Sequence, residues 1–145
     1  MSLLPTGLTL RLSETPDAAF RDYLINGITA HHADFLPPVS SLPLAIMLQN
    51  EHGAWQGGLV GRSWQNWLFI ELLFVPQALR GQGLGHALLT RAEIEAKNRG
   101  CTGLWLDTLN PAALAFYLRH GFESFGELAN YPNQSRRVFL RKSII

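Results

Sequence analysis

The hydrophobic and polar positions near the start of the chain follow two different periods. Leucines occupy every second position in the segment 8–13, which is the alternation of a half-buried strand. The apolar residues between positions 20 and 28 lie instead on one helical stripe. Thr15 can cap this helix, and Pro16 suits its first position. The pattern therefore predicts a strand followed by a helix.

Three further strands are predicted in the middle of the chain. The segments 42–50, 54–64 and 67–75 are apolar or alternating runs, and they are separated by two short turns, Asn-Glu-His-Gly and Gln-Asn. Strands that are joined by such short turns pair with antiparallel neighbours. We therefore expect an antiparallel meander in this part of the chain.

The second half of the chain predicts two helices among further strands. A helix is expected from Gly83 to Arg99, because apolar side chains recur every four residues there. A second helix is expected between Asn110, its cap, and Gly121, which ends it. The remaining strands are expected at residues 102–108, 122–128 and 136–142.

The final predicted strand, 136–142, carries four of the twelve lysines and arginines of the chain. Charge of this kind protects an edge strand from pairing with another molecule, so we expect it to be an edge strand. Together the elements predict one domain, residues 1–145, of the α/β (α+β) class, with a mixed sheet flanked by helices.

The composition narrows the classes of function. With 145 residues and a net charge of +1, the chain has too little positive charge for a protein whose main role is to grip nucleic acid. It contains no apolar run of about 18 residues and no signal-peptide pattern. Cys101 is the sole cysteine, and the five histidines lack metal-ligand spacing. We therefore expect a cytoplasmic protein without a metal ion, a nucleic-acid partner or a membrane partner.

Three glycines, Gly81, Gly83 and Gly85, lie where an apolar strand leads into a predicted helix. The first N–H groups of a helix lack internal partners and carry the positive end of its dipole, and glycines let a ligand approach them. Such a junction suits a phosphate or pyrophosphate, although an ordinary tight turn is the alternative. The loop matches neither the phosphate loop of nucleoside triphosphatases nor the dinucleotide fingerprint, but Asp107 lies where a ribose-binding acid would.

Two motifs resemble those of the GNAT superfamily of acetyl-CoA-dependent N-acetyltransferases. The first is Gln/Arg-x-x-Gly-x-Gly/Ala at a strand–helix junction, which here runs from Arg80 to Gly85. The second is Asn-x-x-Ala-x-x-x-Tyr-x-x-x-Gly-Phe, which here runs from Asn110 through Tyr117 to Phe122. The resemblance implies the fold of that family, a central mixed, mostly antiparallel sheet of about six to seven strands with a splayed central strand pair.

The resemblance also implies where the cosubstrate, acetyl-CoA, would bind. The backbone N–H groups of the glycine loop would hold the CoA pyrophosphate, and the exposed edge of the preceding strand would hydrogen-bond the pantetheine arm. Asn110 either contacts CoA or only caps its helix. The cosubstrate-binding residues implied in this way are Leu73, Phe74, Val75, Arg80, Gly81, Gln82, Gly83, Leu84, Gly85, His86 and Asn110.

Glu71 is an isolated carboxylate in an apolar strand. Strict alternation would place it on the same face as Leu73 and Val75, in apolar surroundings that raise the pKa of a carboxylate toward neutrality. An alkyl amine is mostly protonated at neutral pH, so its acetylation needs a base, directly or through water. We predict Glu71 as this catalytic base, similar to the glutamate of the diamine acetyltransferases. A solvated or arginine-paired side chain is the alternative.

Tyr117 matches the tyrosine that lies near the CoA sulfur in the family. Its hydroxyl, with an ordinary pKa of about 10, would protonate the leaving thiolate. We therefore predict Tyr117 as the catalytic acid, and a packed core aromatic is the alternative.

The predicted reaction is the transfer of acetyl from acetyl-CoA to a primary amine of an unidentified acceptor by direct attack. The acceptor is a small-molecule amine or a protein amine, and a homodimer is compatible with the resemblance. Two other functions remain open at this point. One is a non-catalytic acyl-CoA-binding or sensing module on the same fold. The other is a nucleotide-binding regulator that would use the glycine loop and Asp107.

Overall fold

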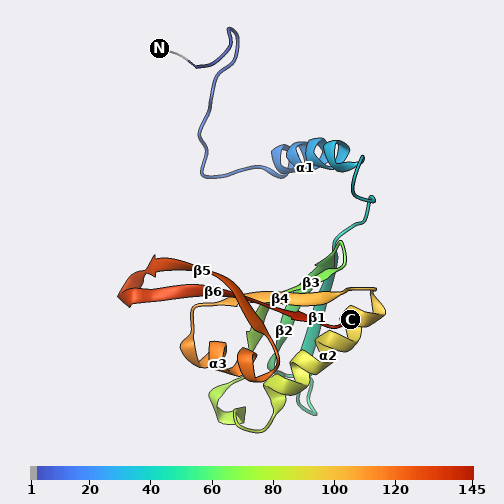
Figure 1. Ribbon diagram of the computed structural model, residues 1–145, viewed down its shortest axis with the longest axis vertical. Coiled ribbons are helices and arrows are strands. Elements are labelled where there is room, and N and C mark those ends of the chain that lie inside the picture. Colours follow the sequence, from blue (N-terminus) through green and yellow to red (C-terminus); the bar gives the residue numbers. More distant parts are fainter. Residues whose placement is uncertain (1–2) are drawn as a thin grey trace. The chain divides into compact units, whose positions relative to one another are not determined.

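The computed structural model describes residues 3–145 (Figure 1). The described residues separate into two compact units, residues 3–38 and residues 39–145. Each unit has secondary structure of its own, a single helix in the first and the whole sheet with its covering helices in the second.

The N-terminal unit contains one helix, α1 (Ala18–His32). Its N-cap is Asp17, whose carboxylate accepts a hydrogen bond from the backbone N–H of Phe20 at 2.7 Å. The predicted cap Thr15 and the predicted first position Pro16 therefore lie before the helix, because Asp17 satisfies one of its free N–H groups. The predicted strand at 8–13 was also wrong, since none of the strands in the described residues includes it.

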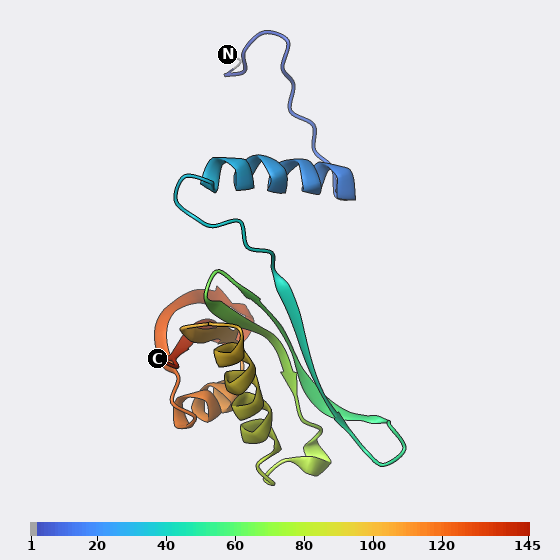
Figure 2. The same ribbon diagram turned by 90° about the vertical axis from the view of Figure 1, so that its right-hand side faces the viewer.

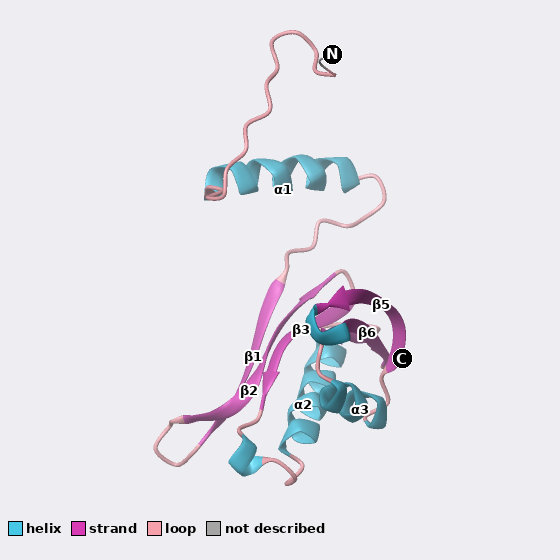
Figure 3. Cartoon of the chain, turned by 90° about the vertical axis from the view of Figure 1, so that its left-hand side faces the viewer, coloured by secondary structure: helices cyan, strands magenta, loops and turns pink. Residues whose placement is uncertain are grey.

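The C-terminal unit is built on a six-stranded sheet with the order β1-β2-β3-β4-β6-β5. Figure 3 shows its strands in magenta and its helices in cyan. Every neighbouring pair is antiparallel except β3 and β4, which are parallel. This arrangement confirms the predicted mixed, mostly antiparallel sheet. The strands are β1 (Leu42–Gln49), β2 (Trp55–Trp64), β3 (Trp67–Phe74), β4 (Gly103–Thr108), β5 (Glu123–Tyr131) and β6 (Ser135–Ser143).

Two helices, α2 (Leu84–Asn98) and α3 (Pro111–Arg119), pack against the sheet (Figure 2). α2 contacts β1 to β4, and α3 contacts β4 and β5. Ala92 and Ala96 of α2 are fully buried, and their small side chains let the helix lie close to the sheet. The largest fully buried side chains of the core are Leu68, Leu89, Leu104, Leu106 and Leu140.

The parallel strands β3 and β4 separate after only three residue pairs. Their pairing runs from Trp67 with Gly103 to Phe69 with Trp105. Beyond Phe69, β3 stays paired with β2 as far as Phe74, but within the described residues its other edge has no strand beside it. The splayed central pair is therefore present, and the free edge of β3 can offer backbone N–H and C=O groups to a ligand.

A β-bulge in β3 lies at the start of this free edge. Ile70 and Leu72, on either side of Glu71, pair with two residues that are adjacent to each other in β2. Glu71 therefore has no partner in β2. The extra residue interrupts the alternation of faces, so Ile70 and Leu73 both pack against the core while Glu71 and Leu72 are exposed. The prediction that Glu71 shares a face with Leu73 and Val75 in apolar surroundings is therefore wrong.

The charged strand β6 lies between β4 and β5, so it is not the edge strand that its cations suggested. Its cations instead pair with acidic residues on neighbouring elements, which makes them compatible with an interior strand. The pairs are Arg136 with Glu127 at 2.6 Å, Arg137 with Asp107 at 2.7 Å, Arg141 with Glu123 at 3.0 Å and Lys142 with Glu93 at 2.6 Å.

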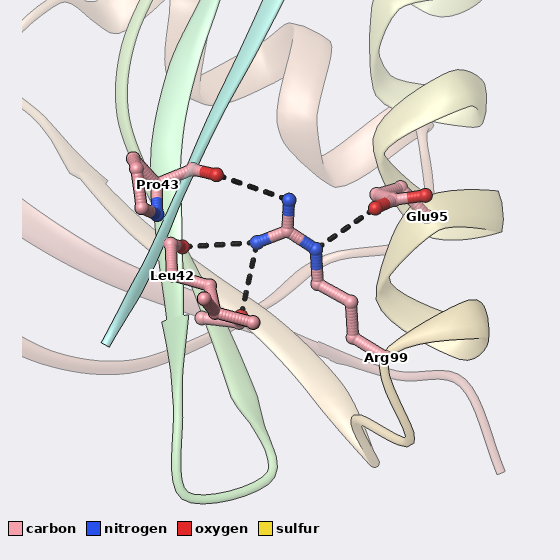
Figure 4. Close-up of polar contacts among 5 residues, drawn as sticks. Leu42, Pro43, Glu95 and Arg99 are labelled. Carbon is pink, nitrogen blue, oxygen red and sulfur yellow. Dashed lines mark hydrogen bonds and ion pairs between the residues drawn. The ribbon is translucent and has the colours of Figure 1, made fainter. Parts of the chain in front are cut away.

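Arg99 ties the end of α2 to β1 and β2 (Figure 4). Its Nη1 donates to the carbonyl oxygen of Leu42 at 2.9 Å and to Ser63 Oγ at 3.0 Å, and its Nη2 donates to the carbonyl oxygen of Pro43 at 3.0 Å. Its Nε donates to Glu95 at 2.9 Å, which lowers the pKa of that carboxyl group. One guanidinium group thus joins three elements.

We expect Arg99→Leu to lower the free energy of unfolding by about 2–3 kcal/mol, because it removes several hydrogen bonds from a charged donor and leaves Ser63 Oγ in the interior without this partner. Urea unfolding monitored by tryptophan fluorescence measures this change. Arg91→Leu, at an exposed position of the same helix, is the matched control, with an expected change within about 0.5 kcal/mol. Equal losses in the two variants would contradict a clamping role for Arg99.

Candidate active site

A pocket of about 480 Å³ lies between the end of β3, the glycine loop and α3. All of the predicted cosubstrate-binding residues except Gln82 line it, and Tyr117 lines it as well. Glu71 does not. The further lining residues, which sequence reasoning missed, are Leu79, Ala112, Ala113, Phe116 and Arg119. The pocket therefore brings the two sequence motifs together in space.

Gly83 is the N-cap of α2 and has a left-handed backbone, with φ of +80°. Any other L-residue would be strained in this conformation. A Cβ atom built on Gly83 would meet nothing within 4 Å, so the space beside it is open to a ligand. The residues that follow, Leu84 to His86, carry the N–H groups that lack partners inside a helix, and they line the pocket. This geometry suits an anion.

Gly85 serves a different purpose. A Cβ atom at this position would lie 3.1 Å from the ring of Phe116, which is tighter than ordinary van der Waals contact. The missing side chain therefore lets the first turn of α2 approach α3 closely. As a result, the two motifs form adjoining walls of the same pocket.

Arg80 both shapes the loop and adds positive charge. Its Nε donates to the carbonyl oxygen of Val75 at 2.9 Å, which closes the loop between β3 and α2. Arg119, at the last position of α3, also lines the pocket. Two arginines in the lining, together with the N-terminus of α2, make the pocket suitable for a phosphorylated ligand.

Asn110 is the N-cap of α3, as predicted. Its Oδ1 accepts hydrogen bonds from the N–H groups of Ala112 at 2.9 Å and Ala113 at 3.4 Å. Pro111 occupies the first helical position, where a missing N–H costs nothing. Asn110 also lines the pocket. A contact between Asn110 and CoA, in addition to its capping role, stays a prediction.

Tyr117 belongs both to the core and to the pocket. Its side chain is buried and packs edge to face on Phe122, with ring centroids 5.8 Å apart. Burial, together with the nearby charge of Asp107, raises the pKa of Tyr117 above its ordinary value. The hydroxyl group therefore keeps its proton throughout the neutral range, which a group that donates a proton requires.

Glu71 lies two residues beyond the last residue pair between β3 and β4. Its side chain is exposed, so the burial on which its predicted basicity depended is absent. The bulge nevertheless places a carboxylate at the start of the free edge of β3. The role of base stays a prediction.

The structure also places together two histidines that the sequence did not connect. Nδ1 of His86, in the first turn of α2, lies 2.8 Å from Nδ1 of His120, which caps the end of α3. The two residues are 34 positions apart and belong to different helices, so no local pattern could reveal the pair.

The comparison with family models decides the assignment. The model described as "Acetyltransferase (GNAT) family" matches residues 21–122. The chain belongs to this family. The family resemblance inferred from the two motifs is thereby confirmed, and the protein is a GNAT acetyltransferase that uses acetyl-CoA as acetyl donor.

Relatives of known sequence or structure agree with membership of the GNAT family. The chain is 37% identical to acetyltransferase Atu2258 of Agrobacterium fabrum over 90% of this chain and 96% of that protein. It is 36% identical to blasticidin-S acetyltransferase of Streptomyces morookaense over 66% of this chain and 74% of that protein. A solved structure described as an acetyltransferase from Agrobacterium tumefaciens is 36% identical, with a TM-score of 0.85, and the match covers 94% of this chain and all of that chain.

Membership of the GNAT family also bears on the nucleotide-binding alternative. That alternative relied on Asp107 as a ribose-binding acid, but Asp107 accepts a hydrogen bond from Arg137 Nε at 2.7 Å. The assignment as an acetyltransferase replaces the nucleotide-binding alternative.

Within residues 3–145, no helix is long and apolar enough to cross a membrane, and no group of three or more potential metal ligands occurs.

Proposed function

We propose that this GNAT enzyme transfers acetyl from acetyl-CoA to a primary amine of a small-molecule acceptor by direct attack. The observation that carries the proposal is the single pocket that the glycine loop, the end of β3 and Tyr117 share. In this arrangement the pyrophosphate binds at the N-terminus of α2, beside Arg80 and Arg119. The pantetheine arm lies along the free edge of β3 and carries the thioester toward Tyr117.

The reaction then follows from the chemistry of the groups. Glu71 removes one proton from the ammonium form of the acceptor, directly or through water. The amine nitrogen attacks the thioester carbonyl, the C–N bond forms and the C–S bond breaks. Tyr117 protonates the leaving thiolate of CoA, and its proton is restored from the surplus proton on the new amide nitrogen. The products are the acetylated amine, CoA with a free thiol and one proton.

The position of Glu71 on a bulge supports its part in this scheme. Bulges re-aim a side chain and are common beside active sites. An exposed carboxylate suits a route in which a water molecule links it to the acceptor. The same exposure makes Glu71 accessible to a cationic acceptor that arrives from solvent.

The proposed acceptor class is a small, polar molecule with a primary amine. The likeness to blasticidin-S acetyltransferase supports an amine-bearing antibiotic as the first acceptor to test. A protein amine, either an N-terminus or a lysine, is the second class. We also propose that the chain forms a homodimer, and sedimentation velocity measurements on the full chain test this point.

Release of the CoA thiol in the presence of a library of primary amines tests the proposal, with blasticidin S included. We expect thiol release that depends on the amine, together with an acceptor that gains the mass of one acetyl group. Binding of acetyl-CoA without thiol release from any amine would favour the non-catalytic acyl-CoA-binding module instead.

We expect Gly83→Val to weaken CoA binding about tenfold or more, equivalent to about 1.4 kcal/mol, because its side chain occupies the open space beside the loop. Gly100→Val is the matched control. Gly100 also has a left-handed backbone, with φ of +78°, and open space around it, but it lies outside the pocket lining. Both variants carry backbone strain of about 1–3 kcal/mol. Calorimetric titration with CoA measures the affinity of each variant. Similar affinities of the two variants would contradict the assignment of the glycine loop to CoA binding.

A further inference from the structure

His86 and His120 form a pair that the reaction scheme above does not use. Their Nδ1 atoms lie 2.8 Å apart, and their rings meet edge to face with centroids 4.5 Å apart. Two Nδ1 atoms at this distance share one proton, so one ring donates and the other accepts. The direction of this hydrogen bond decides which atom His86 offers to the pocket.

The surroundings of His120 set the direction. Its side chain is 3% exposed, and its Nε2 lies 3.3 Å from Oε1 of Glu93, close enough for the carboxylate to attract an N–H group although not in hydrogen-bond geometry. A carboxylate at this distance favours a proton on Nε2, which leaves Nδ1 of His120 as the acceptor. Lys142 compensates the charge of Glu93, since its Nζ donates to Oε1 at 2.6 Å and to the carbonyl oxygen of His120 at 2.8 Å.

His120 also stays neutral. Burial, followed by the charge of Lys142, lowers the pKa of His120 below its ordinary value, so this ring is uncharged at neutral pH. With its proton on Nε2, His120 can only accept at Nδ1, and His86 must therefore donate its own Nδ1–H. The ring atom of His86 that remains for a ligand is Nε2. His86 is exposed and lines the pocket, at the third position of α2.

We propose that His86 is a cosubstrate-binding residue that takes up a proton at Nε2 when the CoA pyrophosphate binds. The inference rests on the proposed position of the pyrophosphate at the N-terminus of α2. A bound anion favours the protonated form of the His86 ring, because Nε2–H can then donate a charge-assisted hydrogen bond to a phosphate oxygen.

Other charged groups surround the two rings. Arg80 and Arg119 line the pocket with His86. Glu93 and Lys142 face His120 from α2 and β6 and form an ion pair with each other. His120 is therefore a positioning residue, which holds the His86 ring through Nδ1 and accepts no proton itself.

Calorimetric titration with dephospho-CoA between pH 6 and pH 8.5 tests the proposal. This probe retains the pyrophosphate but lacks the 3′-phosphate, a monoester whose own second ionisation near pH 6 would add to the proton balance. For the wild type we expect binding roughly three- to fivefold tighter at pH 6 than at pH 8, a size typical of a screened charge at an exposed site. Titration at pH 7 in two buffers of different ionisation enthalpy should show net proton uptake.

Variants of the two histidines separate binding from positioning. His86→Asn keeps an amide N–H near the place of Nδ1 and lacks Nε2, so its affinity should be independent of pH. His120→Asn keeps an acceptor near the place of Nδ1 and should retain the pH dependence. His120→Leu provides no acceptor and should reduce the pH dependence. Thermal unfolding of each variant checks that it folds, and His86→Asn alone decides the question if His120→Leu does not fold.

The same pH dependence and the same proton uptake in wild type and His86→Asn would overturn the inference while leaving the pyrophosphate site intact. A failure of the proposed function would differ, because the wild type would then bind neither CoA nor dephospho-CoA at any pH. That result would overturn the inference as well.

Discussion

Tyr117→Phe is expected to lower kcat roughly 10²-fold, the loss typical of removing a general acid. The variant keeps the ring and its edge-to-face contact with Phe122, so CoA affinity should change by less than about twofold. The reason lies in the hydroxyl proton, which burial and the charge of Asp107 hold in place by raising the pKa of Tyr117. A raised pKa also means that the wild-type rate should show no loss from ionisation of this group below about pH 10.

Steady-state kinetics with a saturating amine, together with CoA titrations, measure these two quantities separately. Were kcat to stay within a factor of two of the wild-type value, Tyr117 would be a packing residue, and another group or solvent would protonate the thiolate. A parallel rise in the dissociation constant for CoA would also contradict the assignment, since it would show that the hydroxyl contributes to binding.

Glu71→Gln is expected to lower kcat/KM roughly 10²-fold at pH 7 and to regain part of this loss at alkaline pH. The glutamine keeps the size of the side chain but cannot accept the proton of the acceptor. At neutral pH an alkyl amine, with a pKa near 10.4, is almost entirely protonated, whereas free amine already exists in solution at pH 10. Because the side chain is exposed, the free energy of unfolding of the variant should lie within about 0.5 kcal/mol of the wild-type value.

Rate profiles of kcat/KM from pH 6 to pH 10 provide the measurement. Glu51→Gln, at an exposed position in the turn between β1 and β2, removes the same charge elsewhere and should leave the profile unchanged. Parallel profiles for wild type and Glu71→Gln would show that another residue or a water chain removes the proton.

The parts of the fold that the sequence predicted well depend on local chemistry. Asn110, Pro111 and Gly121 mark the ends of α3 through capping and backbone conformation, and these signals act within one helical turn. The glycine loop was predictable for the same reason. The position of β6 in the sheet was not predictable, because the order of the strands depends on pairings between distant segments. Four cations are as compatible with an edge strand as with an interior strand that has acidic neighbours.

The candidate site shows the same division between local and distant effects. The two motifs predicted most of the pocket lining, since each residue follows a fixed spacing from a strand end or a helix cap. The bulge at Glu71 was missed, because it depends on how β2 pairs with β3 and alternation alone cannot reveal an extra residue. His86 and His120 were missed because only the close packing of α2 on α3, which Gly85 permits, brings their rings together.

The central claim is that acetyl-CoA binds in the pocket between the end of β3, the glycine loop and α3. Amide hydrogen exchange with and without acetyl-CoA tests it most directly, because the proposal relies on backbone N–H groups at the loop and at the free strand edge. We predict slower exchange in peptides that cover residues 73–86 and 110–119. No change there, or slower exchange confined to residues 133–136 beside the smaller cavity of about 230 Å³, would contradict the account.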